Sequence, residues 1–176
     1  NNVVYIFKES HSGAWDATKV RNISQTNQFW NWETDEFSLA HYKSFQGLDF
    51  DAIIIFLGTN GISLDPMTKN GALGIKTLVD DIRKEDATTP ILVVNTIFRS
   101  GQNGIGRQGN TDGYSASSEC KFNADRKVML LAKALDEVLE GVDNVYICPV
   151  GFTHDSAYNF GINKVSVNPR LTDTSE

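Results

Sequence analysis

The 176-residue sequence is poor in the residues that build disulfide frameworks and metal centres. It has two cysteines, Cys120 and Cys148, and three scattered histidines, which are too few for a disulfide scaffold and too dispersed for a metal site. Its apolar runs have the length of strands, well short of the roughly 20 residues that cross a membrane. We therefore expect neither a bound metal nor a membrane span.

Basic residues are also in deficit. The sequence has 16 Lys and Arg against 22 Asp and Glu, which gives a formal net charge of -6 at pH 7. Binding to the phosphates of nucleic acid requires a concentrated basic surface, so a nucleic-acid partner is not expected. A content of 40% hydrophobic and 22% charged residues is typical of one globular domain with a full hydrophobic core.

The two ends of the sequence differ from those of a self-contained domain. It begins with Asn1 and Asn2 directly before the apolar run 3–7, and it ends with the polar segment 171–176. We expect residues 1–176 to form a single domain that is incomplete at both ends. Flanking segments of the same protein would then complete the fold.

Strand-like and helix-like patterns alternate along the chain. Apolar, β-branched runs predict strands at 3–7, 52–57, 91–97 and 145–150. Apolar residues at helical spacing predict three longer helices: 39–45, capped by Ser38 and ended by Gly47; one from Asn70 to about 87; and 121–140. This order predicts an α/β fold of the flavodoxin-like type, a three-layer α/β/α sandwich with a central parallel sheet.

The predicted strand at 52–57 is the most informative segment. Its six apolar residues lack a polar face, which predicts a central strand covered on both sides. It is followed by Gly58, Thr59, Asn60 and Gly61, which place a side-chain amide at the carboxyl edge of the sheet, where open α/β folds bind ligands. Asn60 is therefore the first candidate functional residue, although an asparagine can also merely satisfy the amides of a turn.

Two segments carry a resemblance to a known family. Residues 49–60, DFDAIIIFLGTN, resemble the third conserved block of the SGNH or GDSL hydrolases, in which an aspartate precedes a buried strand that ends in Gly-x-Asn. The resemblance implies that the Asn60 side chain donates to the oxyanion formed in ester hydrolysis. Gly61 stands where the family commonly continues with Asp.

Residues 9–15, ESHSGAW, resemble the second block of one SGNH branch, typically His-Glu-Gly-Arg-Ser-Gly-Trp. The resemblance implies that the N–H of Gly13 is a second oxyanion donor, while Ala14 is inserted and His11 stands where Arg is usual. His11, Trp15 and Arg99 are candidates for contacting the substrate. The alternatives without a function are that His11 and Arg99 are solvated surface residues and that Trp15 packs under a long loop.

The resemblance implies a serine esterase that hydrolyses O-acyl esters, above all O-acetyl groups on carbohydrate, without a metal or organic cofactor. Similar modules belong to phage tail and cell-surface proteins, which implies an extracellular or virion-associated setting. Trp15, Trp30 and Trp32 are candidates for a surface on which a sugar ring stacks, with packing under a long loop as the alternative.

The family's nucleophile and base are not identified in the sequence. SGNH enzymes use a serine in a Gly-Asp-Ser block and an Asp-x-x-His pair, and no Asp-x-x-His occurs here. We expect the serine block before Asn1 and the pair beyond Glu176. A rival alignment makes Ser10 a degenerate nucleophile, served by His154 and Asp155.

Two other classes of function stay open. The first is a carbohydrate-binding or structural module that keeps the SGNH scaffold without catalysis. The second, a flavodoxin-like nucleotide binder, is disfavoured because no strand is followed by a phosphate-binding loop that opens directly into a helix.

Overall fold

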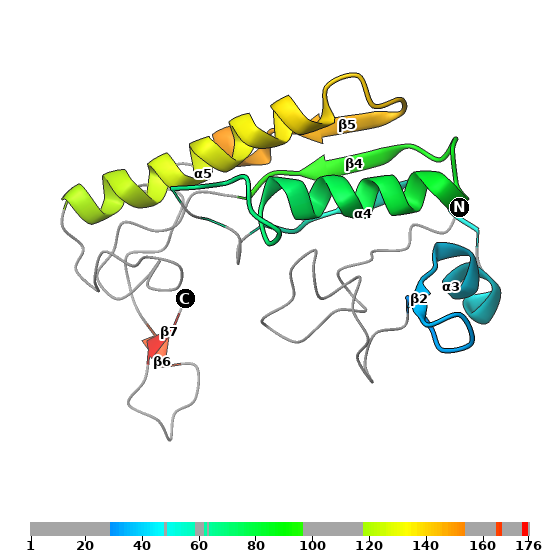
Figure 1. Ribbon diagram of the computed structural model, residues 1–176. Coiled ribbons are helices and arrows are strands. Elements are labelled where there is room, and N and C mark those ends of the chain that lie inside the picture. Colours follow the sequence, from blue (N-terminus) through cyan, green and yellow to red (C-terminus); the bar gives the residue numbers. More distant parts are fainter. Residues whose placement is uncertain are drawn as a thin grey trace.

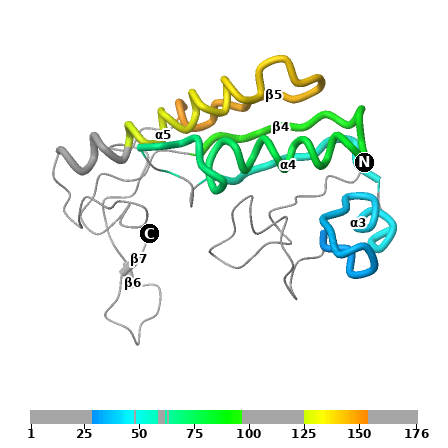
Figure 2. Tube along the Cα trace, in the orientation of Figure 1, coloured from blue at the N-terminus to red at the C-terminus, as the bar shows by residue number. Residues whose placement is uncertain are grey.

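The computed structural model describes residues 29–47, 49–58, 62, 64–96 and 118–153, together with two short strands near the C-terminus. Side chains are described for all of these except residues 118–124 and the two short strands. The sequence-based predictions of a strand at 3–7 and a loop from 99 to 117 lie outside the described residues. Figure 1 shows the elements, and Figure 2 traces the chain through them.

Three parallel strands form the sheet of the described domain. They are β3 (Ile53–Ile55), β4 (Ile91–Val94) and β5 (Val145–Cys148), in the order β3-β4-β5. Ile53 pairs with Ile91, and Ile91 with Val145. The predicted α/β class with parallel strands is therefore confirmed.

The two crossover helices lie side by side on one face of this sheet (Figure 1). They are α4 (Ala72–Glu85) and α5 (Ser118–Leu139), close to the predicted ranges. Two successive crossovers of the usual right hand place both helices on the same side. The described residues thus form one sheet and one helix layer against it, and the three-layer sandwich stays a prediction.

The core fills the space between these two layers. Ile75, Leu78, Val79 and Ile82 recur at helical spacing along α4, and all are at most 1% exposed. The sheet and α5 supply the opposing residues: Ile53, Ile55, Ile91, Val93, Val128, Leu131 and Leu135. The apolar stripes predicted for the two helices are therefore the ones that hold the layers together.

The strand β3 departs from its prediction in one respect. Its run 52–57 is not buried on both sides, because Ile54 is only partly buried and Phe56 is 42% exposed. The alternation follows from the two-residue period of a strand, which turns only every second side chain toward α4 and α5. Among the described strands β4 lies in the middle, and the central position of β3 stays a prediction because the strand predicted at 3–7 is outside the described residues.

The helix α3 (Leu39–Gln46) confirms the predicted capping residues. The Ser38 hydroxyl accepts a hydrogen bond from the His41 N–H at 3.1 Å, and Gly47 ends the helix at φ 62°. A short antiparallel hairpin precedes it, made of β1 (Trp30–Asn31) and β2 (Glu36–Phe37). The sequence pattern did not predict this hairpin.

The last residue of α4 joins α3 to the rest of the domain. The Glu85 carboxylate accepts hydrogen bonds from the Ser38 hydroxyl at 3.0 Å and from the backbone N–H groups of Leu39 and Ala40 at 3.2 and 2.6 Å. A negative group at the start of a helix satisfies free N–H groups and complements the helix dipole. Glu85 therefore caps α3 from another helix.

A cation and two carboxylates add a second link between α3 and the following segments. The Lys43 ammonium lies 2.7 Å from Asp49 and 3.1 Å from Asp86, and its pKa is raised, chiefly by the hydrogen bond to Asp49. Burial raises the pKa of Asp86, but hydrogen bonds from Thr89 and Lys43 outweigh it, so the pKa lies well below its usual value. Lys43 and Asp86 are thus both ionised in the folded protein.

The Arg83 guanidinium supplies a third link. It donates to the carbonyl oxygens of Asp143 and Asn144, at 3.2 and 2.9 Å, and to that of Asp86 at 2.9 Å. These carbonyls lie just before β4 and β5. All three links are therefore at the amino edge of the sheet, where α4 ends and the strands begin.

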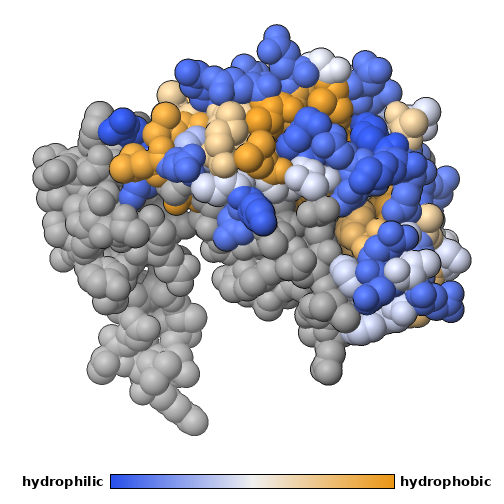
Figure 3. Space-filling view, in the orientation of Figure 1, coloured by the Kyte–Doolittle hydropathy of each residue, from blue (hydrophilic) through white to orange (hydrophobic). Residues whose placement is uncertain are grey.

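The remaining described elements are short. The 3-10 helix η2 (Val150–Thr153) follows β5, and β6 (Val165–Ser166) pairs with β7 (Thr174–Ser175). On the face that displays α4 and α5, polar residues surround hydrophobic ones (Figure 3). No helix in the described part of the chain has the length and apolar character needed to cross a membrane.

Candidate functional site at the carboxyl edge of the sheet

The residues that sequence analysis proposed for the site lie outside the described residues. This applies to Gly13, Asn60, His11, Trp15 and Arg99, which stay predictions. It applies equally to the rival catalytic residues, Ser10, His154 and Asp155. The structure does describe Gly58, two residues before Asn60, and Thr96, three residues before Arg99, both at the carboxyl edge of the sheet.

Gly58 is the last described residue of the segment that follows β3. Its φ of 122° is outside the range that side-chain-bearing residues adopt readily. A Cβ at this position would lie 2.9 Å from the Leu131 side chain and 3.0 Å from Thr96 Oγ1. The conformation therefore favours glycine here, and a Cβ would be accommodated only if the Leu131 and Thr96 side chains moved. Thr59 and Asn60 are the next two residues in the sequence.

Asn95 follows β4 at the same edge and is 1% exposed. Its N–H donates to the Cys148 carbonyl at 3.2 Å, which extends the pairing of β4 with β5 by one bond. Its side-chain Oδ1 accepts the N–H of Gly151 at 2.8 Å. The Asn95 amide thus fixes the segment after β5, while Nδ2, the donor end of the same amide, has no hydrogen-bond partner.

Thr96 is 3% exposed, and its Oγ1 also lacks a hydrogen-bond partner. Its carbonyl oxygen lies 2.6 Å from where a Cβ on Gly151 would be, so the segments after β4 and β5 are in close backbone contact. Together Asn95 and Thr96 touch the turns that follow both neighbouring strands. The carboxyl edge therefore holds two buried polar atoms without partners, which native folds rarely tolerate without a reason.

The helix α5 extends over this edge. Its 22 residues would span about 33 Å, whereas a four-residue strand spans about 13 Å. Lys127 lies one helical turn before Leu131, on the same side of α5, and is only 3% exposed. A charged side chain is thus buried above the strand ends.

Asn95, Thr96 and Lys127 were not predicted as site residues. The strand prediction continued through Asn95 and Thr96 to Ile97, whereas β4 ends at Val94. The available signal was the polar pair directly after a β-branched run, the same signal that drew attention to Asn60.

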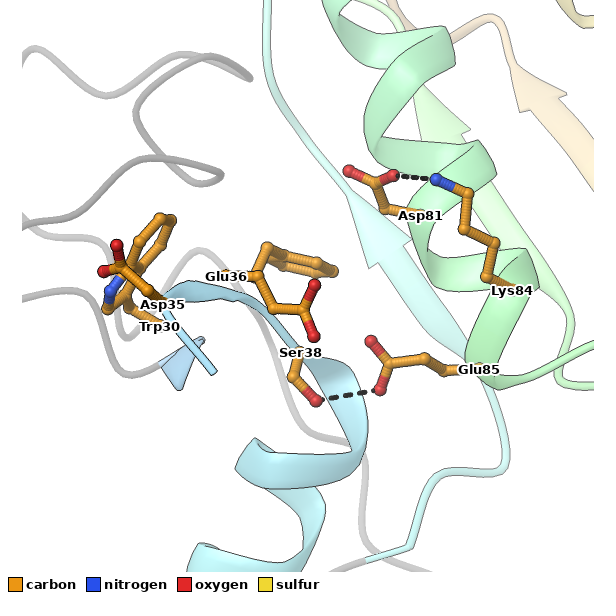
Figure 4. A pocket seen from close by; sticks show the side chains of 8 residues that line it. Trp30, Asp35, Glu36, Ser38, Asp81, Lys84 and Glu85 are labelled. Carbon is orange, nitrogen blue, oxygen red and sulfur yellow. Dashed lines mark hydrogen bonds and ion pairs between the residues drawn. The ribbon is translucent and has the colours of Figure 1, made fainter. Parts of the chain in front are cut away.

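A cavity of about 430 Å³ lies elsewhere, between the β1-β2 hairpin and the C-terminal half of α4 (Figure 4). Two interactions join residues that line the cavity. The Ser38 hydroxyl donates to the Glu85 carboxylate, and the Lys84 ammonium lies 2.8 Å from the Asp81 carboxylate. The residues that line it are mainly acidic or polar: Trp30, Asp35, Glu36, Phe37, Ser38, Asp81, Lys84 and Glu85. Because α4 ends at the amino edge, this cavity is separate from the site at the carboxyl edge.

Two of the three tryptophans proposed for sugar stacking are in the described residues, near this cavity rather than at the strand ends. Trp30 lines the cavity, and its buried Nε1 lacks a hydrogen-bond partner. Trp32 is 57% exposed. In the described residues, the tryptophans therefore do not flank the turn after β3.

The described residues contain no group of three or more His, Cys, Asp or Glu side chains that could hold a metal ion. Cys148 is a free thiol, partly buried at the end of β5. Comparison of the chain with models of protein families, with curated proteins and with solved structures finds no match. Its function must therefore be inferred from its own residues.

Proposed function

We propose that this chain is the oxyanion-stabilising part of an SGNH-type serine esterase that hydrolyses O-acyl esters, in particular O-acetyl groups on carbohydrate. In this proposal the N–H of Gly13 and the side-chain amide of Asn60 donate to the oxyanion. His11, Trp15 and Arg99 contact the rest of the substrate. The reaction needs no metal and no organic cofactor.

The restricted backbone at Gly58 is the observation that carries the proposal. Gly58 lies at the carboxyl edge of a parallel sheet, where α/β folds bind ligands, and its φ of 122° and close neighbours restrict the backbone path out of β3. Thr59 and Asn60 are the next two residues. A donor that follows such a residue begins from a fixed point, and preorganisation is what an oxyanion donor requires.

The chemistry suits an asparagine. Attack on an ester carbonyl converts its oxygen into an oxyanion, and a neutral amide N–H stabilises that charge without having to change protonation state. Loss of one such donor typically lowers kcat by about 10²- to 10³-fold. The proposal also requires a serine nucleophile and a histidine base, and we infer that they belong to segments of the complete protein that flank residues 1–176.

The test is Asn60→Ala in the complete protein, assayed with an aryl acetate. We expect kcat to fall by about 10²- to 10³-fold with little change in KM, because the lost donor acts mainly in the transition state. Asn60→Asp should be at least as damaging, since it replaces the donor by a negative charge. The melting temperature of each variant shows whether the fold is retained.

Asn31→Ala is the matched control. Asn31 is an asparagine of the β1-β2 hairpin whose Oδ1 accepts the Glu33 N–H at 2.9 Å, and the hairpin is remote from the carboxyl edge. It should leave turnover unchanged. Full activity of Asn60→Ala would refute the assignment.

The alternative is a non-catalytic carbohydrate-binding or structural module on the same scaffold. Gly61 in place of Asp and the lack of an Asp-x-x-His motif favour it. The coding sequence on either side of residues 1–176 discriminates between the two. A Gly-Asp-Ser block upstream and an Asp-x-x-His pair downstream support the esterase, whereas their absence supports the module.

A further inference from the structure

We draw no further inference here: the strongest candidate, the face of the sheet opposite α4 and α5, where the uncharged side chains of Ile54, Leu92 and Tyr146 stand on paired strands and Tyr146 is 56% exposed, carries none because nothing in the described residues shows what covers it.

Discussion

Replacing Gly58 by alanine should destabilise the domain more than the same exchange at Gly47 or Gly141, which also have positive φ but have open space around them. The substitution adds one methyl group three residues after the end of β3. Its effect has two separable causes, the φ of 122° and the lack of space around Cα.

The magnitude follows from these two causes. A residue with a side chain in a sparsely populated backbone conformation costs about 1–3 kcal/mol. Overpacking adds about 1–3 kcal/mol, because the new Cβ would lie 2.9 Å from Leu131 and 3.0 Å from Thr96, both buried. We therefore expect Gly58→Ala to lower the free energy of unfolding by about 2–6 kcal/mol.

Two other glycines isolate the causes. Gly141 has φ 72° and no atom within 4 Å of the place that a Cβ would occupy, so Gly141→Ala measures conformational strain alone, about 1–2 kcal/mol. Gly151 is not among the described glycines with positive φ, and its Cβ would lie 2.6 Å from the Thr96 carbonyl, so Gly151→Ala measures overpacking. The stiffer unfolded chain of an alanine variant affects all three alike and cancels in the comparison.

Urea denaturation of the three variants, followed by tryptophan fluorescence, gives the free energies to compare. The loss of stability in Gly58→Ala should exceed that in Gly141→Ala by at least about 1 kcal/mol, because overpacking adds to the strain and because φ 122° is less accessible to alanine than φ 72°. Equal losses would show that the space around Gly58 is not restricted as described. Under the esterase proposal, Gly58→Ala should also lower turnover, since it displaces the backbone that leads to Asn60.

Two predictions concern the amino edge. Glu85→Gln should lower the free energy of unfolding by about 0.5–2 kcal/mol, as loss of a helix cap does, whereas Glu137→Gln, in an exposed pair with Lys133, should change it little. The lowered pKa of Asp86 means that its ionisation stabilises the fold above its unfolded pKa, near 3.8, and that this contribution is lost as the pH falls below that value. Asp86→Asn should therefore show a weaker loss of stability than the wild type between about pH 4 and pH 2 in acid titrations; equal slopes would contradict the assigned cause.

Periodicity made most of the described fold predictable. The stripe of Ile75, Leu78 and Ile82 predicted α4, and Ser38 and Gly47 predicted both ends of α3, because caps are local chemistry. The β1-β2 hairpin was missed, since strands of two residues are too short to show a two-residue period. The prediction that 52–57 is buried on both faces was wrong, because which side of a strand is covered depends on packing against distant segments.

The candidate site was predictable only in part. The Gly58-Thr59-Asn60 segment could be singled out because glycine and asparagine after an apolar run are typical of a turn, and of these three residues the structure describes Gly58. The role of Asn95 could not, since its partner Gly151 is 56 residues away and the contact exists only once β4 and β5 are paired. The sequence also could not reveal that Asn95 Nδ2 and Thr96 Oγ1 have no hydrogen-bond partner.

The side chains of Glu85, Arg83 and Lys43 all tie the domain together at the amino edge of the sheet. An engineer could therefore exchange the segments that follow Gly58 and Thr96 in the sequence while leaving these ties untouched. The same division would allow related chains to diverge in what they bind while keeping one frame. This arrangement makes the domain suitable as a scaffold for loop grafting, with residues 58, 96 and 151 as the natural points of attachment.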